Sequence, residues 1–551
     1  MTHEVPYRKS LSVTTLEETA PIAPGPKKGA LVRSTLVVTT VRGIDFVLSF
    51  LVSVLLAGRF GVSSQIDAFF LARRITVGFA ETIRHLVNMV VVPAVVARQE
   101  RGEQGAGHGL PRQFYLFLGF IALLTLAGTF APRPLVAFFA PGFDGERFWF
   151  ASRLTSIMMP LLAIAIVSSL LMALLQANRR FFSAEASKAL QRALLVAVLF
   201  FLIPPLGIFD AAWTMLLGGV LGLVYLVAVS WRFLRADPSR LLTARAKKPS
   251  AERARGGGLV AAIILQLYYV ATSLVDFAVA STLDVGSVSA LEYGTRLVSI
   301  LPGLVTASVY TVIYPELIRA MHDKDPARSA AKIGEYQRLT LFIQMPVSIG
   351  LMLTAYPIVD IIFGHGQFGQ ANVAVTAAVT VGYAAAAIFL MPFHVATSAI
   401  YADPARSPAV DIAIICAGGF AIRAALVAAS APFGAEGIAW AATLATAATL
   451  VLTMVIARRR FPHFSLAGQA RDFALTGLCG LAAAAAGVAL LQVLPSDVGL
   501  VDGLAVIALT GSAAVAAYAA AGWLLRVPEL RQASTLIAAR LHRVRPRREG
   551  A

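Results

Sequence analysis

Charged side chains inside long apolar runs are the residues of this sequence that could most clearly do chemistry. Asp276 lies within the apolar stretch Leu259–Thr282. Arg296 lies in a second stretch, which stays apolar to Tyr314. Charged groups at membrane depth are costly and therefore functional candidates. An arginine that faces a polar cavity can bind a phosphate group with two parallel hydrogen bonds. The purely structural alternative is a buried ion pair between Asp276 and Arg296.

Further ionisable residues fall within or beside apolar runs, and several have a structural alternative. Arg42 and Asp45 stand three positions apart, so a local ion pair on one helix would explain them. Positions near helix ends would explain Asp360 and Asp411 through capping or contact with the membrane interface. The same interface would accommodate arginines of the second apolar run if its helix begins late. The remaining candidates are Asp67, Arg73, Arg74, Glu81, Arg84, Glu292 and His394.

The composition identifies the class of protein. The 551 residues are 58% hydrophobic and only 14% charged, whereas soluble domains have about 25% charged residues. A membrane-spanning helix needs roughly 20 mainly apolar residues. We count about fourteen such segments, which predicts an all-α integral membrane protein. They lie near residues 35–58, 66–97, 114–131, 151–176, 185–206, 209–232, 258–282, 286–316, 338–363, 371–401, 408–430, 434–457, 472–494 and 499–525.

The basic residues alternate along the connectors between these segments. Connectors rich in Lys and Arg lie near residues 98–112, 179–188, 232–255, 319–332 and 458–471. The positive-inside rule places this set, and both termini, in the cytoplasm. The net charge of +17 therefore reports topology and contact with anionic lipids. No pattern of interleaved basic and aromatic residues indicates nucleic-acid binding.

The longest basic connector divides the chain into two similar parts. It follows six apolar segments and precedes six more, which favours two six-helix lobes with a substrate site between them, a common transporter plan. The predicted parts are a disordered cytoplasmic tail at 1–33, an N-lobe at 34–233, a cytoplasmic linker at 234–257, a C-lobe at 258–460, two further helices at 472–526 and a basic cytoplasmic tail at 527–551.

The sequence carries no motif of soluble-enzyme chemistry. It has no P-loop, so ATP hydrolysis is not expected, and no HExxH or CxxC pattern. Cys416 and Cys479 stand in apolar runs and are expected to be buried, unreactive thiols. We therefore expect no enzymatic activity, no metal site and no resident cofactor; a coupling ion is left open.

Two motifs of the seventh and eighth apolar segments resemble the MurJ/MviN family of lipid II flippases. Val275–Ser281 resembles the family's VDxxxAS motif, and Gly286–Leu297 resembles its GSxSALYYADRL motif. Other matches occur in the family's order, from about residue 35 to residue 460. They are Gly61–Phe70, Ala140–Phe143, Asn178–Phe181, Gly364–Phe368 and Tyr401–Pro408.

This resemblance implies the fold of the multidrug/oligosaccharidyl-lipid/polysaccharide exporter superfamily, in which two six-helix lobes surround a central cavity and work by alternating access. It implies a cationic cavity for the pyrophosphate and sugar head group of an undecaprenyl-linked precursor. Arg296 matches the family's essential cavity arginine of the eighth helix, and Asp67 matches its conserved acidic residue. The family's first helix carries two arginines, of which at most Arg42 is retained. His394 stands where the family has a lysine.

The leading hypothesis is a flippase that moves lipid II across the bacterial inner membrane from the cytoplasmic to the periplasmic leaflet. Arg296 would bind the pyrophosphate. The residues expected to assist it are Arg42, Arg73, Arg74 and Arg84 in substrate binding, and Asp67, Asp276, Asp45 and His394 in gating or ion pairing. The membrane potential or a coupled ion would supply the energy.

The partners expected are the lipid-linked saccharide, membrane lipids and enzymes of cell-wall or polysaccharide synthesis. Three other functions stay open at this point. One is export of a different lipid-linked oligosaccharide for exopolysaccharide or capsule. Another is cation-coupled drug export, although a basic cavity suits anions better. The last is a non-transporting membrane scaffold that retains the fold.

Overall fold

The computed structural model describes residues 28–100, 112–201, 207–236, 257–322, 325–494 and 500–530. Every regular element in these ranges is helical, as predicted. The α-helices are α1 (Lys28–Phe60), α2 (Ser64–Glu100), α3 (Arg112–Phe130), α4 (Pro132–Phe139), α5 (Gly145–Met158), α6 (Pro160–Ala177), α7 (Phe181–Phe201), α8 (Ile208–Ala236), α9 (Gly258–Ala280), α10 (Ser287–His322), α11 (Pro326–Leu353), α12 (Ala355–Phe363), α13 (Gln370–Ala402), α14 (Ala409–Ala429), α15 (Gly434–Arg460), α16 (Leu466–Leu491) and α17 (Leu500–Leu524).

The described helices confirm a multi-pass membrane protein. Ten spans are long and apolar enough to cross a bilayer, and there are twelve if each of two bent helix pairs forms one span. The bent pairs are α3 with α4, at 105°, and α11 with α12, at 64°. The other two predicted segments correspond to α7 and α10. The predicted count of fourteen therefore stays a prediction.

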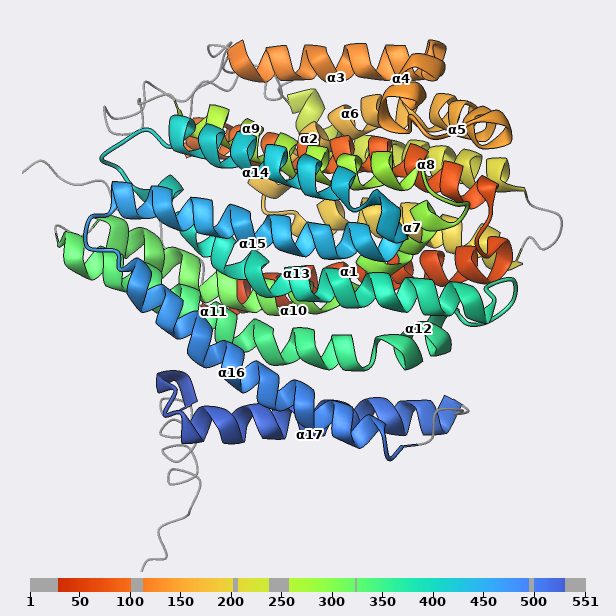
Figure 1. Ribbon diagram of the computed structural model, residues 1–551. Coiled ribbons are helices and arrows are strands. Elements are labelled where there is room, and N and C mark those ends of the chain that lie inside the picture. Colours follow the sequence, from red (N-terminus) through yellow and green to blue (C-terminus); the bar gives the residue numbers. More distant parts are fainter. Residues whose placement is uncertain are drawn as a thin grey trace, which may run out of the picture.

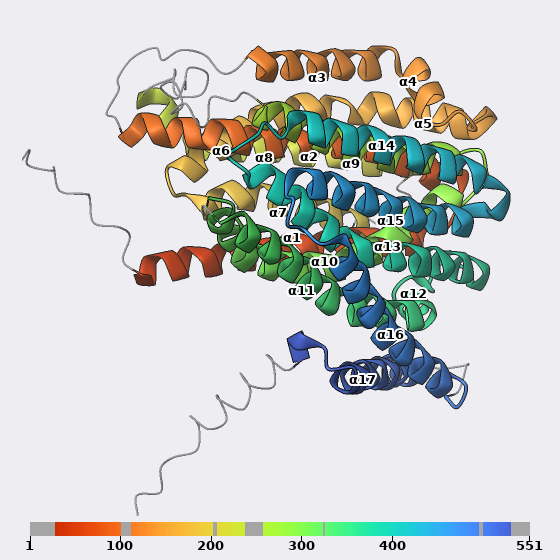
Figure 2. The same cartoon turned by 60° about the vertical axis from the view of Figure 1, so that its left-hand side comes forward.

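By their contacts, helices α1–α15 form two neighbouring groups, and α16 with α17 lies beside the second group (Figure 1). In the first helix group, α1–α8, α1 packs on α7, and α2 packs on α5 and α6. In the second helix group, α9–α15, α13 packs on α10, α11 and α15. Helix α2 meets α9 and α10 across the boundary. Both views place α3 on one outer side and α16 with α17 on the opposite side (Figure 2).

The outer surface of α3 is apolar. Leu116, Leu123 and Phe130 are 63%, 66% and 80% exposed. A contiguous apolar surface of this kind is unfavourable in water and marks contact with a membrane or a partner. Together with the apolar span lengths, it indicates that α3 faces lipid.

Two predicted boundaries shift in the structure. Helix α1 begins at Lys28, inside the tail predicted to reach residue 33. At the other end, Glu529 lies in the predicted basic tail but forms an ion pair with Arg338 of α11, so the start of this tail packs against the helices. Residues 1–27 and 531–551, and linker residues 237–256, lie outside the described residues.

Two glycines with positive φ join the turn after α1 to the loop after α12. Gly61 has φ 57° and Gly366 has φ 65°. A Cβ on Gly61 would overlap the carbonyl oxygen of Gln367, and a Cβ on Gly366 would overlap that of Gly58. The Gln367 amide donates to the Gly58 carbonyl at 3.0 Å. Both positions thus require glycine for backbone conformation and for close approach.

We expect Gly61→Ala to lower the thermal stability of the purified protein more than Gly145→Ala does. Gly145 also has positive φ, but a Cβ there would meet nothing within 4 Å. The control therefore carries only the left-handed strain of about 1–2 kcal/mol, while Gly61→Ala adds a backbone clash. Thermal unfolding in detergent measures the difference. Equal losses in the two variants would contradict the predicted contact between the loops.

Candidate functional site

Two consecutive arginines of α2 share one carboxylate of α10. Arg73 Nη1 lies 2.8 Å from Glu292 Oε1, and Arg74 Nη2 lies 2.6 Å from Glu292 Oε2. The Arg74 guanidinium also lies over the Phe277 ring, 4.5 Å from its centroid. Their burial, with side chains 10–27% exposed, makes the charge pairing strong. This cluster ties the first helix group to the second.

Arg296 lies one helical turn beyond Glu292 on α10. Its Nη2 donates to the Ser49 backbone carbonyl of α1 at 3.0 Å and also to the Ser49 hydroxyl. Within the part of the chain that the structure describes, no carboxylate oxygen lies within 4.0 Å of its guanidinium. Arg296 therefore bridges the two helix groups with a positive charge that no neighbouring side chain neutralises directly.

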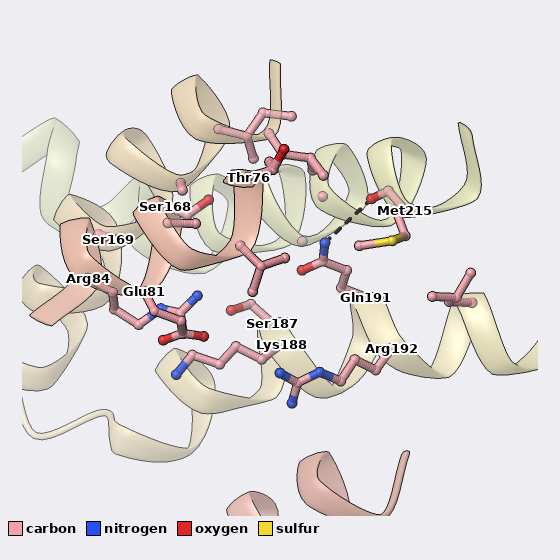
Figure 3. A pocket seen from close by; sticks show the side chains of 18 of the residues that line it. Thr76, Glu81, Arg84, Ser168, Ser169, Ser187, Lys188, Gln191, Arg192 and Met215 are labelled. Atoms are coloured by element: carbon pink, nitrogen blue, oxygen red, sulfur yellow. Dashed lines mark hydrogen bonds and ion pairs between the residues drawn. The ribbon is translucent and has the colours of Figure 1, made fainter. Parts of the chain in front are cut away.

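A cavity of about 130 Å³ extends from this boundary into the first helix group. It lies between α1, α2, α6, α7 and α8, and its lining includes Ser49 and Arg73. Figure 3 shows the polar part of the lining, with Glu81 and Arg84 of α2 beside Lys188 of α7. Sequence reasoning assigned Lys188 to a connector; the structure places it within α7.

The local ion pair between Arg42 and Asp45 does not form. Arg42 instead pairs with Glu185 of α7 at 3.1 Å, and its side chain is 66% exposed. Asp45 pairs with Arg192, also of α7. Both residues therefore hold α7 against α1, and Arg42 does not line the cavity.

The carboxylate of Asp67, for which gating or ion pairing is predicted, lies at the start of α10. Its two carboxylate oxygens accept hydrogen bonds from the backbone N–H groups of Gly286, at 2.7 Å, and Ser289, at 2.8 Å. These amides begin α10, where the unpaired N–H groups and the helix dipole favour a negative charge. Asp67, which is fully buried, therefore caps α10 from α2 and fixes the helix that carries Arg296.

Asp276 forms a buried ion pair with Arg423. The sequence suggested Arg296 as its partner in the structural alternative. Arg423 of α14 donates to both oxygens of Asp276, at 2.9 and 2.5 Å. The Tyr383 hydroxyl donates to the same carboxylate at 2.7 Å. Arg423 was not among the predicted site residues. It lies inside the apolar helix Ala409–Ala429 and, like Arg296, is a charged residue within an apolar run.

The remaining candidates lie in local contacts. Arg84 donates to both carboxylate oxygens of Glu81, one turn away, at 2.6 Å. His394 Nδ1 lies 3.2 Å from the Tyr269 hydroxyl, away from the Arg73, Arg74 and Glu292 cluster. Asp411 stands in the first turn of α14, as its helix-end alternative predicted. Of the arginines predicted to bind substrate, Arg73 and Arg84 of α2 both line the cavity.

Comparison with known proteins decides the family. The family described as "Lipid II flippase MurJ" matches residues 56–501. The chain belongs to this MurJ family. It is 27% identical over 332 residues to a probable lipid II flippase MurJ of Rhizobium meliloti (strain 1021), a match that covers 58% of this chain and 61% of that protein. The chain thus spans less than two thirds of this relative's length.

Other relatives and solved structures agree with the MurJ assignment. The lipid II flippase MurJ of Burkholderia cenocepacia is 24% identical over 375 residues, 65% of this chain and 71% of that protein. A lipid II flippase MurJ in an inward closed conformation aligns with a TM-score of 0.66 at 18% identity, covering 89% of this chain and 99% of that one. An inward-facing multidrug resistance MATE transporter aligns at 0.57 and 12% identity, covering 76% and 95%. The last two matches establish a shared fold.

We expect Arg423→Gln to destabilise the protein more than the double change Asp276→Asn with Arg423→Gln. The single change leaves a buried carboxylate without its cation, which typically costs about 3–5 kcal/mol. The double change removes both charges together. Thermal unfolding of the purified variants tests this order. A double variant no more stable than the single one would show that the pair is not the main function of Arg423.

Proposed function

We propose that this protein moves lipid II, the undecaprenyl-pyrophosphate-linked precursor of peptidoglycan, from the cytoplasmic to the periplasmic leaflet of the bacterial inner membrane. Membership of the MurJ family supports this substrate. The observation in the molecule that supports it most is Arg296, a cation at the boundary of the two helix groups with no carboxylate oxygen of the described residues within 4.0 Å of its guanidinium. Its guanidinium has five N–H donors, so donors remain for phosphate oxygens beyond its bonds to Ser49.

The contacts of the site suggest how alternating access would work. In this proposal the two helix groups act as the lobes predicted at residues 34–233 and 258–460. Arg73 and Arg74 of one group hold Glu292 of the other, so a change between inward- and outward-facing states would rearrange these contacts. A bound pyrophosphate would compete with Glu292 for the arginines and thereby couple binding to movement of the lobes.

The other predicted residues take supporting roles. Asp67 positions α10, while Asp276 with Arg423 fixes α9 against α14. Arg42 and Asp45 position α7, and His394 belongs to the packing of α13 on α9. The process is transport rather than catalysis. Movement of one charge through 100 mV supplies roughly 2.3 kcal/mol, so the membrane potential, or a coupled ion, can bias the two states.

We expect this chain to restore growth to bacteria depleted of their lipid II flippase, and Arg296→Ala to abolish the rescue. Loss of a charge-assisted contact of about 1.5–3 kcal/mol reduces substrate affinity roughly tenfold or more. Growth and the appearance of lipid II in the periplasmic leaflet are the measurements. Arg133→Ala, at an exposed position of α4, is the matched control and should behave as wild type.

Failure of the wild-type chain to rescue, despite its presence in the membrane, would contradict lipid II as the substrate. Export of another lipid-linked glycan that depends on Arg296 would then support the exopolysaccharide or capsule alternative. Unchanged transport in Arg296→Ala would show that this arginine is not the substrate site.

A further inference from the structure

We propose that the cavity inside the first helix group is a second binding subsite for a phosphate-type anion, with Lys188 and Arg192 of α7 among its ligands. The inference rests on the proposed function in identifying that anion with the pyrophosphate of the transported lipid. The charge and the geometry of the cavity favour a phosphate-type anion whatever its source.

The charge of the lining selects the class of ligand. Four basic side chains and one acidic side chain line the cavity, namely Arg73, Arg84, Lys188, Arg192 and Glu81. The acidic member, Glu81, is 52% exposed, so water screens it more than it screens the less exposed cations. A partly open cavity with this balance of charge favours an anion over a cationic or apolar ligand.

Carboxylates shared between two cations leave positive charge in excess at the cavity wall. Glu185 pairs with Lys188 at 3.2 Å and also with Arg42. Glu292 pairs with Arg73 and also with Arg74. In each case one cation lines the cavity and the other does not. Because the outer cation can neutralise the carboxylate, the lining cation can interact with a ligand.

Neutral donors and open volume complete the site. Ser168, Ser187 and Gln191 contribute hydroxyl and amide groups to the lining (Figure 3). Gly219 and Gly222 of α8 also line the cavity, and they let α8 approach α6 and α7 closely, because a Cβ there would meet Leu161 and the Ser187 carbonyl oxygen. The volume of about 130 Å³ far exceeds the ~10–15 Å³ that a single water needs. A tetrahedral oxyanion fits both the donors and the space.

The subsite adjoins the proposed primary site. Ser49, which holds Arg296, lines the cavity, and so does Arg73, which holds Glu292. An anion released from Arg296 would therefore meet Arg73 first and then Arg192 and Lys188. We infer that the two phosphate groups of a pyrophosphate, or two successive positions of one group, are distributed between Arg296 and α7.

The test measures binding of inorganic pyrophosphate to the purified full-length protein by calorimetry, in chloride buffer of fixed ionic strength. All variants are made in an Arg296→Ala background, so that the primary site does not contribute. We expect saturable binding that Lys188→Gln weakens about tenfold, the effect of one charge-assisted contact. Ser168→Leu, which fills the cavity without changing its charge, should weaken binding similarly.

Arg180→Gln is the matched control. Arg180 immediately precedes α7 but does not line the cavity, so binding should not change. For Arg192, the double change Asp45→Asn with Arg192→Gln avoids an unpaired buried carboxylate and should weaken binding as Lys188→Gln does. Thermal unfolding verifies that each variant is folded. Absence of saturable binding, or binding that is equal in folded Lys188→Gln and Arg180→Gln variants, would overturn the subsite.

A competition arm distinguishes the source of the anion. Displacement of inorganic pyrophosphate by undecaprenyl pyrophosphate in detergent would identify the lipid head group as the ligand. Binding of pyrophosphate without displacement by the lipid would support the subsite but assign it to a free phosphate compound. Because binding is measured without transport, loss of the proposed flippase activity and loss of the subsite are separate results.

Discussion

The need to neutralise charges in an apolar environment is the constraint on which the rest of this structure depends. Among the described residues, Arg73 and Arg74 on α2 form their ion pairs with Glu292 on α10, more than two hundred residues away. Neither helix can leave the other without exposing charge to a medium that solvates it poorly. The same ion pairs that hold the two helix groups together are therefore those that the proposed transport cycle would rearrange.

Not every intramembrane charge has the same function. Asp67 accepts hydrogen bonds from backbone amides at the start of α10, and Asp276 is neutralised by Arg423. These two carboxylates therefore position helices. Arg296 differs because, among the described residues, the hydrogen bonds of its guanidinium go to Ser49, a neutral residue. The partner of each charged residue, more than its depth in the membrane, therefore distinguishes the structural residues from the site proposed for an anionic substrate.

The cavity beside Arg296 extends this distinction into the first helix group. Two lining cations, Lys188 and Arg73, share their carboxylates with the outer cations Arg42 and Arg74. The outer cation can keep the carboxylate neutralised while the lining cation interacts with a ligand. In the proposed subsite, the basic side chains that α7 contributes to the cavity lining are Lys188 and Arg192.

The sequence by itself determined the all-helical membrane class and the family, and it made Arg296 a candidate for the substrate site, because hydropathy, charge in apolar runs and short motifs are local properties of the chain. It also predicted buried cysteines at Cys416 and Cys479, which the structure confirms. Only the tertiary structure decided the partners. The structure shows that Asp276 pairs with Arg423 and that Lys188 lines a cavity. Both depend on how helices distant in the sequence are oriented and packed, which a local sequence pattern does not specify.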